Sequence, residues 1–177
     1  MKPRVGISRC LLGDDVRYDG TNRRSAAVAN LAQHVEWVAV CPEVEVGMGV
    51  PREPVQLVSD PGGVRSANAR VRLTGVNSGD DWTTRMYEWA RARAATLAAE
   101  RISGFVLKAR SPSCGPAGVA VQDGDGERAL IGRGLFAEAL AAAMPDLPTI
   151  DEEALEDRTV RERFIDSVRR FADRRGI

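Results

Sequence analysis

Short apolar runs alternate with helical segments along most of this chain, and this alternation restricts its fold more than any other feature. Strands are predicted for the apolar runs at residues 4–9, 35–40, 69–74, 104–108, 119–121, 128–131 and 148–150. Helices are predicted at residues 25–33, 80–101, 135–144 and 151–174. Because strands separated by helices form mostly parallel sheets through right-handed crossovers, the chain is predicted to be an α/β protein.

We expect a single domain over residues 1–177, with a mostly parallel, Rossmann-like sheet flanked by helices and with long loops at the C-terminal ends of the strands. The run at residues 35–40 is nearly continuously apolar, as in a strand that is buried on both faces. Four prolines in residues 42–63 predict the longest irregular stretch there. Glycines and aspartates at residues 123–126 predict a hairpin, and Asp80 or Asp81 is predicted to cap the following helix of residues 80–101.

Each of the three cysteines follows a predicted strand. They are Cys10, Cys41 and Cys114, and each lies in a turn rich in glycine or proline. Because the carboxyl ends of parallel strands meet at one edge of a sheet, three thiols that are distant in sequence can converge there. Such soft ligands suit zinc or an iron–sulfur centre. The alternative is that each cysteine is a small buried hydrophobic residue.

Composition and charge indicate the class of protein and its compartment, but they do not identify the substrate. The chain has 25 Lys and Arg residues against 25 Asp and Glu residues, and this balance gives no general reason to expect nucleic-acid binding. The first residues lack the apolar region of a secretory signal, and no segment is long enough to span a bilayer. We therefore expect a cytoplasmic protein with no membrane partner, whose cysteines are free thiols or metal ligands.

Two other kinds of protein fit the pattern less well. In a zinc-stabilised interaction domain the fourth ligand would be the single histidine, His34, but this residue precedes the second predicted strand and is expected at the edge opposite Cys41. Paired C-x-x-C motifs are also absent from the sequence. A nucleotide-binding module without catalysis would be expected to have a glycine-rich or lysine-bearing phosphate loop after the first strand, and the sequence has none.

Five linked motifs lie between residue 10 and residue 115. In order, they are Cys10-Leu11-Leu12-Gly13, Val16-Arg17-Tyr18-Asp19-Gly20, Cys41-Pro42-Glu43, Val50-Pro51-Arg52-Glu53-Pro54, and Leu107-Lys108 with Ser111-Pro112-Ser113-Cys114-Gly115. Together they resemble the thiouracil desulfurase (TudS-like) family, formerly catalogued as a domain of unknown function. The resemblance implies a 4Fe-4S cluster with three Cys ligands, here Cys10, Cys41 and Cys114, and one open iron.

The same resemblance implies an activity. The open iron would bind the sulfur of a thiolated pyrimidine, such as thiouracil, 4-thiouridine or its monophosphate. The C=S group would then be hydrolysed to C=O with release of sulfide and without a redox change. Water must attack an electron-poor ring carbon in such a reaction, and a metal bound to the sulfur polarises the bond that breaks.

The C-terminal part resembles one branch of the family. Residues 132–137, 145–148 and 161–165 are similar to the desulfurase half of fusion proteins that are linked to 4-thiouridine removal from RNA. These 177 residues include no second domain of that kind. A free thiobase, a thionucleotide and thiolated RNA therefore all stay possible as partners, although the net charge does not favour RNA. The arginines at residues 169–170 and 174–175 can either contact phosphates or form the solvated face of a last helix.

Two residues are predicted to be catalytic. Because His34 is the only histidine, a carboxylate is the expected general base, and Glu43 is held near the cluster through Pro42 and Cys41. Glu45 is the nearest competitor, and a solvated loop carboxylate is the alternative role of Glu43. Ser111 is expected to donate a hydrogen bond to the substrate or to the developing oxyanion. Its alternative role is to cap the local turn, which Ser113 is expected to do better.

Further polar residues in the same motifs are candidates for substrate binding. For each of them, a structural ion pair or a hydrogen bond that pins the loop is at least as good an interpretation. These candidates are Asp14, Arg17, Tyr18, Asp19, Arg52, Lys108 and Ser113.

Overall fold

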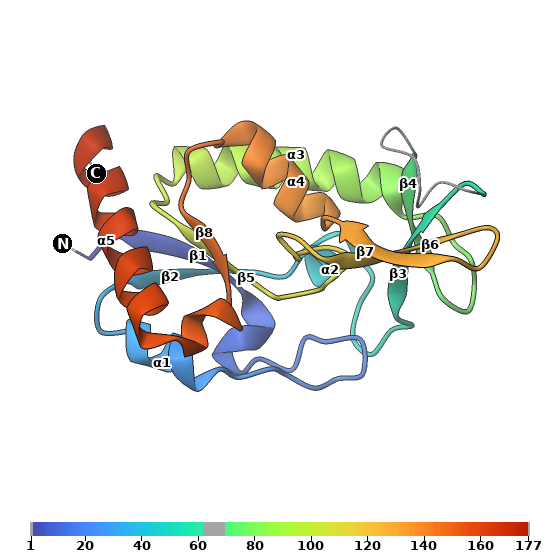
Figure 1. Cartoon of the computed structure of the whole chain (residues 1–177), viewed down its shortest axis with the longest axis horizontal. Helices are drawn as coiled ribbons and strands as arrows, with labels where there is room; N and C mark the ends of the chain where they lie inside the picture. Colours follow the sequence, from blue (N-terminus) through green and yellow to red (C-terminus); the bar gives the residue numbers. More distant parts are fainter. Residues whose placement is uncertain (1, 62–69, 177) are drawn as a thin grey trace.

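The computed structural model of the chain describes residues 2–61 and 70–176. Its strands form two four-stranded sheets, which lie toward opposite ends of the molecule in Figure 1. The first sheet has the order β2-β1-β5-β8 and is parallel throughout. Its strands are β1 (Arg4–Ser8), β2 (Glu36–Val40), β5 (Phe105–Leu107) and β8 (Thr149–Asp151). This sheet confirms the predicted α/β class with a parallel sheet flanked by helices.

The second sheet has the order β4-β3-β6-β7 and is mixed. Its strands are β3 (Val55–Ser59), β4 (Val71–Gly75), β6 (Val119–Asp123) and β7 (Arg128–Gly132). The central strands β3 and β6 are parallel, whereas β4 and β7 pair antiparallel with them. The predicted hairpin is confirmed as β6 and β7. The alternation of runs and helices does not by itself predict this second sheet.

Two strand predictions are wrong in part. Strand β3 lies inside the stretch that its prolines mark as irregular, because Pro54 and Pro61 flank the strand instead of interrupting it. Strand β2 was expected to be buried on both faces, but it lies at the edge of its sheet, and its residues Glu36 and Ala39 are exposed. For β4, residue 69 of the predicted run lies outside the described residues.

Some of the helices begin where a side chain accepts a free backbone N–H group, as Ser25 does from Val28 at 3.3 Å. The helices are α1 (Ala26–Leu31), α2 (Pro42–Glu45), α3 (Thr83–Ala99), α4 (Leu135–Ala143) and α5 (Arg158–Arg175). Of the two predicted caps of α3, Asp81 accepts the Thr83 N–H at 2.8 Å. The last helix begins later than the predicted residue 151, because Asp157 caps it by accepting the N–H groups of Thr159 and Val160 at 2.7 and 3.1 Å.

Both faces of the parallel sheet are covered by helices, so its strands alternate between two cores. Phe105 and Leu107 of β5 pack in a core with α3 and α4, and Val106 between them packs in a second core with α1 and α5. Helices α3 and α4 also cover the mixed sheet, through Met86 and Leu135. This pair of helices spans both sheets in Figure 1 and joins the two halves of the molecule.

The loops that leave β1, β2 and β5 contain the three cysteines. Cys10 lies in the short 3-10 helix η1 (Arg9–Leu12), Cys41 directly follows β2, and Cys114 lies in the turn after β5. The predicted convergence at the carboxyl edge of a parallel sheet therefore rests on three neighbouring strands. Among the residues that the structure describes, no helix has both the length and the apolar character needed to cross a membrane.

Candidate functional site

A cavity of about 390 Å³ opens at the carboxyl edge of the parallel sheet. All three cysteines line it, together with six of the other predicted site residues. These six are Arg17, Tyr18, Glu43, Arg52, Lys108 and Ser111. Asp14, Asp19 and Ser113 do not line the cavity.

Each cysteine is placed by a local turn. Gly13 ends the 3-10 helix of Cys10 in the left-handed region, with φ of 106°, which glycine adopts without steric cost. Cys41 precedes the first turn of α2, where Glu45 accepts its N–H at 3.1 Å. The N–H of Cys114 is donated to the Ser111 hydroxyl at 3.1 Å. Cys41 and Cys114 are buried, and Cys10 is half-buried.

The three thiols influence one another's ionisation. Burial, and after it the charge of Cys41, raises the pKa of Cys10 to about 11. Burial also raises the pKa of Cys41 and raises that of Cys114 well above its ordinary value. The charges of Cys10 and Cys41 raise the pKa of Cys114 further, which places all three sulfurs within electrostatic reach of one another. Three thiolates would therefore need a compensating positive centre.

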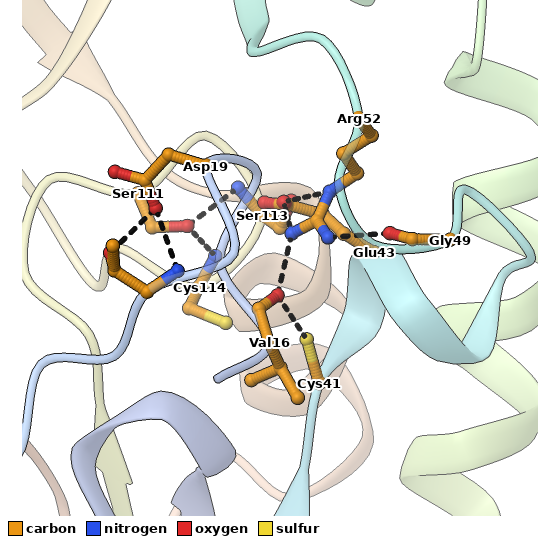
Figure 2. A network of polar contacts seen from close by, with 10 residues as sticks. Val16, Asp19, Cys41, Glu43, Gly49, Arg52, Ser111, Ser113 and Cys114 are labelled. Atoms are coloured by element: carbon orange, nitrogen blue, oxygen red, sulfur yellow. Dashed lines mark hydrogen bonds and ion pairs between the residues drawn. The ribbon is translucent and has the colours of Figure 1, made fainter. Parts of the chain in front are cut away.

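Glu43 is held by two partners in the wall of the cavity. Arg52 donates from Nε to Oε2 at 3.0 Å and pairs with the same oxygen through Nη2, while the Ser113 hydroxyl donates to Oε1 at 2.9 Å (Figure 2). The Arg52 and Glu43 side chains are 6% and 15% exposed. Glu45, the competitor, does not line the cavity and pairs with Arg93 at 3.3 Å.

Arg52 joins three loops of the site. Besides Glu43 it donates to the Gly49 carbonyl at 2.7 Å and to the Val16 carbonyl at 3.0 Å. The Cys41 thiol contacts the same Val16 carbonyl at 3.9 Å. In Figure 2 the sulfurs of Cys41 and Cys114 lie on the same side of the Arg52–Glu43 pair. The buried ion pair thus forms part of the same cavity wall as the thiols.

The two serines of the fifth motif differ from the prediction in which of them caps the turn. Ser111 caps the turn, because its Oγ accepts the N–H groups of Ser113 and Cys114 at 3.2 and 3.1 Å. Ser113, expected to cap it, is fully buried and bonds to Glu43 instead. Because Ser111 accepts two N–H groups and also lines the cavity, its own proton is available there.

The first loop is stabilised by its own ion pairs. Arg9 pairs with Asp14 at 2.6 Å, and Arg17 lies 3.4 Å from Asp19 and 5.2 Å from the centre of the Tyr18 ring. Hydrogen bonds from Thr21 lower the pKa of Asp19. The aspartates therefore orient arginines that line the cavity, as the structural alternative for these residues proposes.

This arrangement matches known proteins along most of the chain. The sequence model of the 2-thiouracil desulfurase family matches residues 5–152, a span that includes all three cysteines and Glu43. The chain belongs to the 2-thiouracil desulfurase family. The predicted family is thereby confirmed.

Two relatives agree with this family assignment. The uncharacterized protein YbbK of Bacillus subtilis (strain 168) is 33% identical over 111 residues, which cover 62% of this chain and 71% of YbbK. A solved structure, described as a 4Fe-4S-dependent thiouracil desulfidase TudS, is 28% identical and superposes with a TM-score of 0.66. The match covers 88% of this chain and 94% of the TudS chain.

Some residues in or beside the cavity have no signal in the motifs. Glu152 does not line the cavity, but it follows β8 and accepts from the cavity residue Lys108 through Nζ at 2.5 Å and from the Ala109 N–H at 2.7 Å. Ser8, at the end of β1, and Arg23 line the cavity. The position of Ser8 and Glu152 at or directly after the ends of parallel strands could have identified them. His34, by contrast, precedes β2 and so lies at the opposite end of that strand from Cys41, as predicted. There it lines a separate hollow beside α5.

Proposed function

We propose that this protein hydrolyses the C=S group of a thiolated pyrimidine to C=O and releases sulfide, with an iron–sulfur cluster as cofactor and without a redox change. The observation on which this rests is that Glu43, held by Arg52 and Ser113, shares one cavity with three cysteines. The family membership and the name of the TudS structure support the same activity. We also propose that residues 1–177 form a single desulfurase domain.

Cys10, Cys41 and Cys114 are the residues that would hold a 4Fe-4S cluster. Their chemistry fits it, because two buried thiols and one half-buried thiol need a positive centre to become thiolates together. When bound, an iron without a protein ligand would act as a Lewis acid on the substrate sulfur and accept the sulfide.

The side chains of this site supply the remaining steps. Glu43 removes a proton from water, whose oxygen forms a bond to the thiolated ring carbon. Arg52 and Ser113 hold the carboxylate in place during this transfer. Ser111 donates its free proton in a hydrogen bond to the oxygen that becomes the carbonyl. The carbon–sulfur bond then breaks and the electron pair leaves with sulfur, which takes up the proton held by Glu43. The oxygen that the ring retains gives its remaining proton to the freed carboxylate as the C=O group forms, so that water and C=S become C=O and hydrosulfide.

Arg23 favours an anionic form of the substrate. It is an exposed residue in the wall of the cavity, and within the described part of the chain its guanidinium has no hydrogen-bond or ion-pair partner. The other cations of the cavity each pair with a carboxylate. We therefore expect turnover of 4-thiouridine monophosphate to exceed that of 4-thiouridine and thiouracil. Sulfide release from these three compounds and from thiolated tRNA tests the order.

The catalytic role is tested with Glu43→Gln. The amide keeps the shape of the side chain but cannot accept the proton, so sulfide release should fall by about 10²–10⁴-fold while iron content is retained. The control is Glu36→Gln, which removes an exposed carboxylate at the opposite end of β2. Turnover like that of the wild type in Glu43→Gln would assign the base to another group.

The cofactor is tested by analysis of the anaerobically purified and reconstituted protein. Iron and labile sulfide in equal amounts, with the broad visible absorption of a cluster, are expected. A colourless protein loaded with zinc would instead support the zinc-stabilised interaction domain.

A further inference from the structure

Glu152 is the carboxylate that directly follows β8, and the proposed reaction assigns it no role. Its two oxygens accept hydrogen bonds from consecutive residues at the end of β5. Oε1 accepts from Lys108 Nζ at 2.5 Å, and Oε2 accepts from the Ala109 N–H at 2.7 Å. The Lys108 and Glu152 side chains are 20% and 12% exposed, so their ion pair is mostly shielded from water. Such a pair is held more firmly than an ion pair on the surface.

This ion pair fixes the ammonium group of Lys108 at the cavity wall. Lys108 lines the cavity, whereas Glu152 lies outside its lining. The backbone of Lys108 is also fixed, because its N–H is donated at 2.9 Å to the hydroxyl of Ser8, the last residue of β1. Of the three N–H donors of the ammonium, one serves Glu152 and one serves the Ala109 carbonyl at 3.1 Å. Within residues 2–61 and 70–176, the third has no acceptor.

A thiolated pyrimidine offers an acceptor for this third N–H. Thiouracil and 4-thiouridine each keep one ring carbonyl besides the C=S group, and the oxygen of that carbonyl takes no part in the proposed reaction. A charged donor forms a strong hydrogen bond to such an oxygen, but the stem of a lysine is flexible and must be ordered first. Because Glu152 already orders the ammonium, the substrate does not have to supply that conformational cost on binding.

We propose that Lys108 binds the unreacted carbonyl oxygen of the pyrimidine, and that Glu152 is the positioning residue that holds the Lys108 ammonium for this contact. The inference rests on the proposed function, because it takes a thiolated pyrimidine as the substrate. The contact is the same before and during the reaction, so it contributes to binding and not to the chemical step. Loss of either side chain should therefore raise KM and leave kcat unchanged.

The test compares Lys108→Met and Glu152→Gln with the wild type in sulfide release from 4-thiouridine monophosphate. In Glu152→Gln the amide oxygen can still accept the Ala109 N–H, but the amide NH₂ group cannot accept from the ammonium. KM should rise about tenfold in Lys108→Met and by a smaller factor in Glu152→Gln, with kcat unchanged in both. In the double variant KM should equal that of Lys108→Met alone, because Glu152 acts through Lys108.

Glu100→Gln is the matched control. Glu100 is also a half-buried carboxylate in an ion pair, with Arg93 at 3.3 Å, but it does not line the cavity. Its KM should equal that of the wild type. Iron content, labile sulfide and circular dichroism are measured on every reconstituted variant. The double variant leaves neither charge of the Lys108–Glu152 pair unpaired, so its KM decides the test if a single variant does not fold.

Three outcomes would overturn the proposal. The first is a KM like that of the wild type in Lys108→Met or in the double variant. The second is a KM in the double variant that equals the product of the two single effects, which would mean that Glu152 acts independently of Lys108. The third is loss of iron from these variants with unchanged circular dichroism, which would assign the pair to the cluster. A wild-type protein that releases no sulfide from any thiopyrimidine would refute the proposed function and this inference together, so the two failures are distinguishable.

Discussion

Replacing Arg52 with methionine should destabilise the fold far more than replacing another arginine of the same cavity. Methionine keeps much of the side-chain length but removes the positive charge and all the N–H donors. Glu43 would then keep only its bond from Ser113, and the carbonyls of Gly49 and Val16 would each lose a donor. The change leaves a mostly buried carboxylate without its counter-charge.

The size of the expected loss in unfolding free energy follows from the burial of the ion pair. Removing one partner of a buried ion pair costs about 3–5 kcal/mol, and the low exposure of Arg52 and Glu43, 6% and 15%, places this pair in that class. The control is Arg9→Met, whose pair with Asp14 is 44% and 46% exposed and should contribute about 0–1 kcal/mol. Both arginines line the cavity and pair with a carboxylate, so the comparison keeps the location and differs in burial and in the two carbonyl contacts of Arg52.

Urea unfolding of the cluster-free proteins, followed by circular dichroism, measures the two losses. The double variant Arg52→Met with Glu43→Gln should regain part of the stability, because the amide removes the unpaired charge. Equal losses in Arg52→Met and Arg9→Met would refute the argument from burial. A double variant no more stable than Arg52→Met would show that the lost carbonyl contacts dominate.

Two further changes test how the site is supported. Gly134→Ala should lower the iron content after reconstitution with little change in circular dichroism. The reason is that the new Cβ would lie 2.4 Å from the Ser113 carbonyl carbon and displace the turn that contains Cys114. Full iron content in this variant would contradict the prediction. Hydrogen bonds from the Ser78 hydroxyl and the Ser78 and Asn77 N–H groups lower the pKa of Glu53 below its ordinary value of 4.5. The stabilisation of the fold by ionised Glu53 is therefore complete above pH 4.5 and is lost as the pH falls through the lower pKa of the folded state. The difference in unfolding free energy between the wild type and Glu53→Gln should shrink below pH 4.5. A difference that stays constant with pH would refute this.

Much of the site could be predicted because its residues follow strands. Cys10, Cys41 and Cys114 lie after parallel strands, and the edge where such strands end is a general property of α/β sheets. Glu43 had to lie close to Cys41 because only Pro42 separates the two residues along the chain. These inferences needed only local pattern and topology, so they did not depend on side-chain packing.

Partners that meet through packing could not be predicted. The pairing of Glu43 with Arg52 and Ser113 joins residues up to 70 positions apart. Whether Ser111 or Ser113 caps the turn depends on which hydroxyl faces the buried carboxylate. The second sheet was likewise hidden, because β3 is flanked by prolines and pairs with β6, which is distant in sequence.

The sequence by itself therefore determined the α/β class, the family and the three converging cysteines, because these follow from periodicity and from motifs that are local in the chain. Only the tertiary structure decided how the charges of the cavity are paired, that Glu152 fixes Lys108, and that Ser8 lies between two cysteine loops. Such contacts depend on the distance and orientation of side chains from different strands, and a linear pattern contains neither.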